Sequence, residues 1–237
     1  MRARLVMTLA TLGAATFIAG CATPAGTPTP SATPSPTVAD NGVSALAANE
    51  ILEKAKTALG NAKSVRIKGS ATEDNEKMEF DFKISGDDIG AQITGQGMTV
   101  EIIRIGADAY MKADALWEAL LGAQPQILNA IKGKYLKINA NDDRFKEFTK
   151  LTDPEEILKP EGNISKGEAK TIDGTPAIGL VDEKDKSTLY IATVGEPLPL
   201  RVEDQTGNAL NFTYDEAVTI TAPPAAEVVD ASTLPGF

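Results

Sequence analysis

Met78-Glu-Phe-Asp-Phe-Lys-Ile84 is the stretch of this sequence that decides the fold. Its apolar residues Met78, Phe80, Phe82 and Ile84 alternate with charged ones. Successive side chains of a β-strand point to opposite faces of a sheet, so a period of two indicates a strand with one apolar and one solvated face. The stretch therefore predicts a half-buried strand of the kind found in antiparallel sheets.

The same period continues on both sides of this strand. Upstream, Val65 and Ile67 alternate with polar residues, and downstream three apolar runs follow at 89–95, 98–106 and 108–113. Glycine-rich turns separate these runs, which is the pattern of an antiparallel meander. Further strands are expected at 134–139, 163–172, 175–183, 187–193, 198–204 and 209–217.

One helix is expected before the first strand, over residues 44–60. Ser44 is a candidate N-cap, and Gly60 is expected to end the helix. Three apolar residues fall on one face of this helix: Leu52, Ala55 and Leu59. That spacing predicts an amphipathic helix whose apolar face packs on the sheet.

A helical insert interrupts the strands at residues 114–131. Pro125 divides it, so we expect two short helices that form a lid or plug. A short helix is also expected at 142–151, followed by one more turn at 154–160. Together the elements predict an α+β fold, with a single curved antiparallel β-sheet, a half-barrel, and helices on its concave side.

The inward-facing residues of the early strands are candidates for a ligand cavity. Recurrent glycines in and between these strands permit bending, and the sheet contains few large aromatic residues. Two interpretations remain open: a plain core, or an incompletely filled sheet that holds an apolar ligand. The candidate residues are Phe80, Phe82, Ile84, Ile93, Val100 and Ile102 on the strands, with Trp117, Leu120 and Leu121 on the insert.

The sequence gives no indication of catalysis. It contains no histidine, which excludes Ser-His-Asp and Cys-His sites and histidine-ligated metals. The oxygen-rich run at 139–143 lacks the glycine and the distal glutamate of a calcium loop, and helix capping explains it better. We therefore expect no enzyme activity, no metal and no cofactor. The net charge of −10 also argues against nucleic acid as a partner.

The first forty residues predict export and anchoring. Arg2 and Arg4 precede an uncharged apolar run that ends at Ile18-Ala-Gly-Cys21, and this run is too short to span a membrane. The four residues resemble a bacterial lipobox, in which the cysteine is lipidated and becomes the first residue of the mature protein. The alternative is an ordinary signal peptide with an incidental cysteine. We expect a signal peptide at 1–20 and a protein held at the outer face of the cell membrane by Cys21.

The segment from 21 to 40 is rich in proline, threonine and serine, and nothing in it can pack. It predicts an extended, disordered tether. Either the tether is passive or its Thr and Ser residues beside Pro are O-glycosylated. The remaining residues, 41–237, are expected to form one folded domain.

The order of these features is similar to that of the LppX/LprG family of actinobacterial lipoproteins, whose fold is akin to the LolA and LolB lipoprotein carriers. The stretches that carry the resemblance are LGNAKSVRIKG (59–69), GKYLKIN (133–139) and LYIATVGEPLPLRVE (189–203), of which GEPLPLR (195–201) is the most characteristic. The resemblance covers residues 44–220. It implies an open half-barrel whose hydrophobic cavity carries acylated lipids or lipoglycans through the cell envelope, and it implies no catalytic residue.

Two functions from different classes follow. The first is a membrane-anchored lipid carrier, with an acylated lipid or lipoglycan as ligand and a membrane transporter as a possible partner. The alternative is an envelope sensor, similar to MucB and RseB, that binds a regulatory protein; those proteins usually carry a second domain, and we expect only one folded domain here. A hydrolase is disfavoured because histidine is absent.

Overall fold

We describe the protein from a computed structural model, which describes residues 39–73, 76–122, 124–140 and 154–235. Residues 38–237 form one compact unit. The expected signal peptide, Cys21 and the helix expected at 142–151 lie outside the described residues, as does nearly all of the tether.

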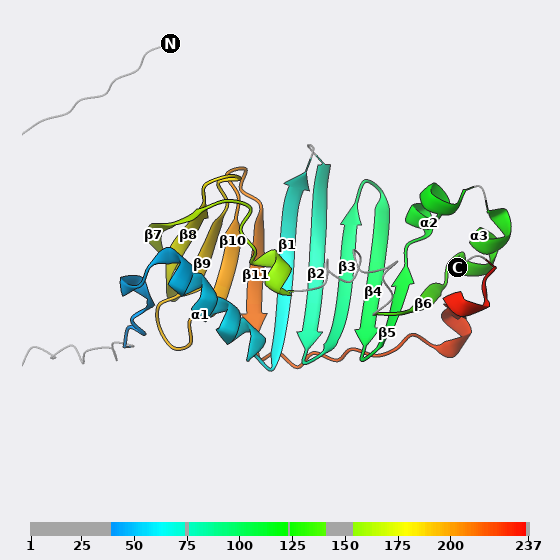
Figure 1. Ribbon diagram of the computed structural model, residues 1–237, viewed down its shortest axis with the longest axis horizontal. Helices are drawn as coiled ribbons and strands as arrows, with labels where there is room; N and C mark the ends of the chain where they lie inside the picture. Colours follow the sequence, from blue (N-terminus) through cyan, green and yellow to red (C-terminus); the bar gives the residue numbers. More distant parts are fainter. Residues whose placement is uncertain (1–38, 74–75, 123, 141–153, 236–237) are drawn as a thin grey trace, which may run out of the picture. The chain divides into compact units, whose positions relative to one another are not determined.

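The unit is built on a single twelve-stranded sheet that is curved and not closed (Figure 1). The spatial order is β12-β6-β5-β4-β3-β2-β1-β11-β10-β9-β8-β7, and every neighbouring pair is antiparallel except β12 and β6, which are parallel. This confirms the curved antiparallel sheet that the sequence predicts. The strands are β1 Ser64–Glu73, β2 Glu76–Ser85, β3 Asp88–Gly95, β4 Met98–Ile105, β5 Asp108–Lys112, β6 Tyr135–Asn139, β7 Ile164–Ile172, β8 Thr175–Asp182, β9 Thr188–Ala192, β10 Pro199–Glu203, β11 Ala209–Tyr214 and β12 Val228–Asp230.

The β1–β11 ladder joins two groups of strands that are far apart in the sequence. On one side, β1 to β5 form the expected meander and β6 joins it after the helical insert, and on the other side β7 to β11 form a second meander. Val65 pairs with Tyr214, Ile67 with Phe212 and Gly69 with Leu210. Without this ladder the two groups would be separate sheets.

The register gives the sheet one apolar face. Ile67 on β1, Phe82 on β2 and Ala91 on β3 lie side by side and are all buried. In the quoted stretch, Phe82 and Ile84 are buried whereas the intervening Lys83 is exposed. On the opposite face, Arg66 donates two hydrogen bonds to the carboxylate of Asp81, at 2.9 and 2.7 Å.

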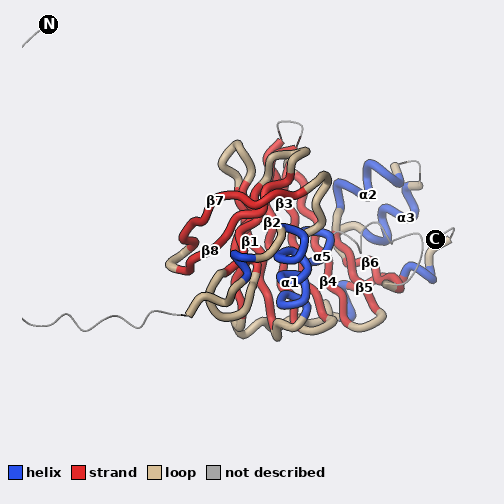
Figure 2. Tube along the Cα trace, turned by 60° about the vertical axis from the view of Figure 1, so that its left-hand side comes forward, coloured by secondary structure: helices blue, strands red, loops and turns tan. Residues whose placement is uncertain are grey.

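Helix α1 (Ala48–Gly60) lies across the concave face of the sheet, beside the short helix α5 (Pro154–Ile157) (Figure 2). Its buried side chains are Ile51, Leu52, Ala55, Ala58 and Leu59, which confirms the expected apolar face. The expected cap at Ser44 is wrong. Residues Val43–Ala45 instead form a separate 3-10 turn, because Leu46 after it is extended.

The N-cap of α1 is therefore Ala47, whose side chain cannot accept a hydrogen bond. The Glu50 carboxylate compensates in part by accepting the Ala47 N–H at 3.1 Å, which is half of a capping box. Glu50 also carries a negative charge into the first turn, where the helix dipole favours it.

The helical insert consists of α2 (Asp114–Leu121) and α3 (Pro125–Ile131), with Pro125 in the first turn of α3 as proline prefers. This confirms two short helices divided at Pro125. The two helices pack on each other, and α2 also packs on β4. They lie at the β4–β6 end of the sheet, whereas α1 contacts β7 and β10 in the other half (Figure 1).

The C-terminal segment was not expected to add a strand. After β11 the chain runs along one end of the sheet to its far edge, where β12 pairs with β6 between 3-10 turns at Ala225–Glu227 and Ala231–Thr233 (Figure 1). A three-residue edge strand has no periodicity to detect, which explains the omission. Among the described helices, none combines the length and apolarity needed to cross a membrane.

Gly69 provides a test of the β1–β11 ladder. A Cβ at this position would lie 1.8 Å from the carbonyl oxygen of Ala209, a clash that requires the backbone to move. Gly69→Ala should lower the free energy of unfolding by about 1–3 kcal/mol, the usual cost of overpacking. Gly60→Ala, where a Cβ meets nothing within 4 Å, is the matched control and should be neutral or stabilising. Denaturant titration measures both, and equal stabilities of the two variants would contradict the close approach.

Candidate ligand-binding cavity

A cavity of about 590 Å³ lies under α1 and the α5 segment, over the half of the sheet that contains β7 to β11. Its volume is in the range of about 300–1,000 Å³ that accommodates drug-sized ligands. Leu52 of α1 and Leu158, just after α5, contribute to its lining and are buried. The rest of its apolar lining is Ala71, Ile157, Pro160, Ile164, Leu180, Leu189, Val202, Ala209 and Leu210.

Four of these side chains form one continuous row across four strands, which we call the floor: Leu180 on β8, Leu189 on β9, Val202 on β10 and Leu210 on β11. Leu180 pairs with Leu189, Leu189 with Val202, and Val202 with Leu210. The next residue in the row is Gly69 on β1, which pairs with Leu210 and has no side chain. The floor is therefore aliphatic and ends at Gly69, where the close approach of the Ala209 carbonyl leaves no room for a side chain.

Polar residues surround one end of the cavity, which we call the mouth. They lie where β1, β8 and β10 end and where β9 and β11 begin. The mouth consists of Ser70, Thr72, Lys159, Glu161, Asp182, Asp185, Ser187, Asp204, Gln205, Thr206 and Asn208. A ligand in this cavity thus meets aliphatic carbon below and hydrogen-bonding groups above.

Asp182 fixes one side of the mouth. It is only 6% exposed, and its carboxylate accepts hydrogen bonds from the backbone N–H of Glu161 (2.6 Å), Gly162 (3.1 Å) and Lys184 (2.7 Å). Burial raises the pKa of Asp182, but these backbone donors outweigh it, and the net pKa lies below its ordinary value. The carboxylate therefore holds the loop before β7 against the β8–β9 turn.

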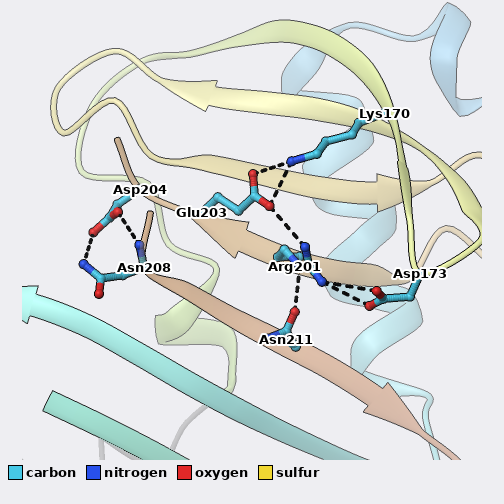
Figure 3. Close-up of polar contacts among 7 residues, drawn as sticks. All are labelled: Lys170, Asp173, Arg201, Glu203, Asp204, Asn208 and Asn211. Carbon is cyan, nitrogen blue, oxygen red and sulfur yellow. Dashed lines mark hydrogen bonds and ion pairs between the residues drawn. The ribbon is translucent and has the colours of Figure 1, made fainter. Parts of the chain in front are cut away.

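Asp204 and Asn208 fix the other side (Figure 3). The Asp204 carboxylate accepts the backbone N–H of Thr206 and of Asn208 at 2.8 and 2.9 Å, and the Asn208 side-chain amide at 2.8 Å. Asn208 also donates to the hydroxyl of Thr72 on β1 at 3.0 Å. Burial raises the pKa of Asp204, but the hydrogen bonds from Asn208 and Thr206 lower it overall.

The opposite face of the same strands is braced by an ion-pair network (Figure 3). Arg201 on β10 hydrogen-bonds Asn211 on β11 at 2.6 Å and pairs with Asp173 and Glu203, at 3.1 and 3.3 Å. Lys170 on β7 pairs with Glu203 at 2.7 Å, and this bond lowers the pKa of the Glu203 carboxyl. The arginine of the GEPLPLR stretch thus ties β10 to β11 and to the β7–β8 turn behind the floor.

The sequence-predicted cavity residues lie over the other half of the sheet. Phe82, Ile84, Ile93, Ile102 and Trp117 are buried, and Phe80, Val100 and Leu121 are half-buried against the core. The side chain of Leu120 lies outside what the structure describes. None of the eight described side chains lines the 590 Å³ cavity. Trp117 instead lines a cleft of about 320 Å³ between α2 and α3.

The predicted residues and the floor are nevertheless parts of one row. Phe80 pairs with Gly69 on one side and with Ile93 on the other, and Ile93 pairs with Val100. Gly69 is therefore the point where the two halves meet. The strands of the floor show the same alternation, for example Ile178 and Leu180 in β8, so the apolar face of this half is also visible in the sequence.

No metal centre is evident in the described part of the chain, which contains no group of three or more Cys, Asp or Glu residues placed to hold an ion.

Comparisons with known proteins give distant structural similarities. A crystal structure of an uncharacterized conserved protein from Thermus thermophilus matches with a TM-score of 0.42 and 13% identity, over 77% of this chain and 98% of that chain. A crystal structure of MucB in complex with MucA(peri) matches with a TM-score of 0.36 and 11% identity, over 74% of this chain and 59% of that chain. A structure of PNGF-II matches with a TM-score of 0.25 and 8% identity, over 67% of this chain and 29% of that chain. No family model and no curated protein matches the sequence. At these scores the similarities carry no argument about activity.

Asp182 predicts an acid dependence of stability. Because its folded-state pKa lies below the unfolded value of about 3.9, its contribution is present above that value and is lost as the pH falls through the folded pKa. Asp182→Asn should lower the free energy of unfolding at pH 7 by about 1–3 kcal/mol, since it weakens the acceptor for buried N–H donors. It should also flatten the loss of stability between pH 5 and pH 2 relative to wild type. Urea titrations across this range measure both effects.

Asp185→Asn, on the exposed part of the same turn, is the control. A wild-type pH profile that Asp182→Asn leaves unchanged would contradict the structural role of the Asp182 carboxylate.

Proposed function

We propose that this protein binds the acyl chain of a lipid in the 590 Å³ cavity and carries the lipid at the outer face of the cell membrane. The observation that supports the proposal is the division of the cavity into an aliphatic floor and a polar mouth. An acyl chain lies along Leu180, Leu189, Val202 and Leu210, while its headgroup remains at the mouth in contact with water.

The hydrophobic effect supplies the binding energy. Burial of each methylene group contributes about 0.8 kcal/mol, so about ten methylenes supply about 8 kcal/mol before the cost of ordering the chain. The floor is suited to a flexible aliphatic chain because it presents only branched aliphatic side chains and no polar group. No chemical step is part of this function, which agrees with a chain that contains no histidine.

The anchor belongs to the same proposal. Lipidated Cys21 holds the protein at the membrane, and the proline-rich tether up to residue 40 lets the domain reach lipids in that membrane or away from it. The mass of the mature chain tests the anchor. A chain that begins at Cys21 and carries a diacylglyceryl group supports it, and a chain without that group contradicts it.

A pair of valine substitutions tests which half of the sheet binds the ligand. Val202 on β10 and Val100 on β4 are both half-buried on the apolar face, but only Val202 lines the cavity. Val202→Phe fills the floor and should weaken binding of a pyrene-labelled diacylglycerol about tenfold or more. Val100→Phe should leave the affinity within about twofold. Fluorescence titration of the purified proteins measures both, and thermal melts establish that each variant is folded.

If Val202→Phe binds as wild type does, the cavity is not the site. If Val100→Phe is instead the variant that loses binding, the site lies among the residues that the sequence predicted, at the other end of the row.

A further inference from the structure

The mouth of the cavity carries a net negative charge. Four carboxylates line it, those of Glu161, Asp182, Asp185 and Asp204, and among the described residues lining it the one cation is Lys159. Lys159 pairs with Glu156 at 3.2 Å. The remaining polar groups of the mouth are hydroxyls and amides, which can hydrogen-bond an uncharged headgroup.

Two of the four carboxylates are held in place as charged groups. Asp182 and Asp204 each accept at least three hydrogen bonds from N–H donors, which stabilise the ionised form. Glu161 is paired with Lys184 at 2.8 Å, but both side chains are largely exposed, so this pair is weak. No rearrangement is needed for the negative field to act on a ligand that enters here.

The size of this field decides between classes of headgroup. Like charges a few ångströms apart repel each other strongly at the effective dielectric of a protein surface, and salt screens this repulsion. A phosphodiester at the mouth would meet four carboxylates and one lining lysine, Lys159, whose exposed pair with Glu156 is as weak as that of Lys184 with Glu161. An uncharged headgroup with hydroxyls meets no such repulsion and finds acceptors in the carboxylates.

We infer that the mouth selects lipids whose headgroup carries no negative charge and rejects anionic phospholipids with the same acyl chains. This inference rests on the proposed function of the cavity. It concerns only the mouth, so the two can fail separately.

The test uses two lipids matched in their acyl chains and in their headgroup hydroxyls, monoglucosyl diacylglycerol and phosphatidylglycerol. Each competes with pyrene-labelled diacylglycerol for the full-length protein at low salt. For wild type, phosphatidylglycerol should need about tenfold more lipid for half-displacement. The ratio should shrink when the salt concentration is raised to screen the carboxylates.

A charge-reversal variant of the mouth is the decisive comparison. Glu161→Lys combined with Asp185→Lys changes two exposed carboxylates and leaves Asp182 and Asp204 intact. This variant should reduce the tenfold ratio to about one or invert it. Asp87→Lys combined with Glu168→Lys makes the same change in net charge at exposed residues outside the cavity lining, and it should keep the wild-type ratio.

Equal displacement by the two lipids in wild type overturns the inference and leaves the cavity proposal standing. A ratio that survives the Glu161→Lys and Asp185→Lys changes also overturns it, because the discrimination then arises elsewhere. If the pyrene-labelled diacylglycerol itself does not bind to wild type, both the inference and the proposed function fail.

Discussion

The β1–β11 ladder is the interaction on which the rest of the structure depends. It joins residues 65–69 to residues 210–214, and so it converts two local meanders into one sheet with a continuous apolar face. The row that forms the cavity floor crosses this ladder at Gly69 and continues to Phe80 on β2. The close approach of Gly69 to the Ala209 carbonyl leaves no room for a side chain there. The same residue therefore permits the ladder and ends the floor.

The two faces of the β7–β11 half have different roles. On the convex face, Arg201, Glu203 and Lys170 bind β7, β10 and β11 together through charged hydrogen bonds. On the concave face, β10 and β11 contribute the aliphatic side chains Val202 and Leu210 to the cavity floor. Asp182 and Asp204 then fix the loops at the strand ends. Such bracing is needed because the aliphatic side chains of the floor make no directional contacts of their own.

Local periodicity was sufficient to predict much of the fold. The alternation in Met78–Ile84 gave the strand and its buried face, and Asp173-Gly174 gave a turn whose two residues both have positive φ. Prediction was wrong at the start of α1, where an extended Leu46 separates the Ser44 turn from the helix. The pairing of β1 with β11 and the parallel edge strand β12 depend on long-range contacts, for which a single sequence gives no local signal.

The position of the cavity could not be predicted for a related reason. Alternation indicates which face of a strand is apolar, but not where the covering layer leaves space. That space depends on how Leu52 and Leu158 lie over Leu180 and Val202, which are distant in the sequence. The residues predicted from the early strands lie on the same apolar face of the sheet as the floor, and some continue its row, but none of those that the structure describes lines the cavity.

Native mass spectrometry of the full-length protein, extracted in mild detergent from the membranes of its own host, tests the central claim most directly. We expect a mature chain with one acylated lipid bound non-covalently. A Val202→Phe protein from the same host should lack this lipid, whereas a Val100→Phe protein should retain it. Wild-type protein that carries no bound lipid, or a Val202→Phe protein that carries as much lipid as wild type, would contradict lipid binding in this cavity.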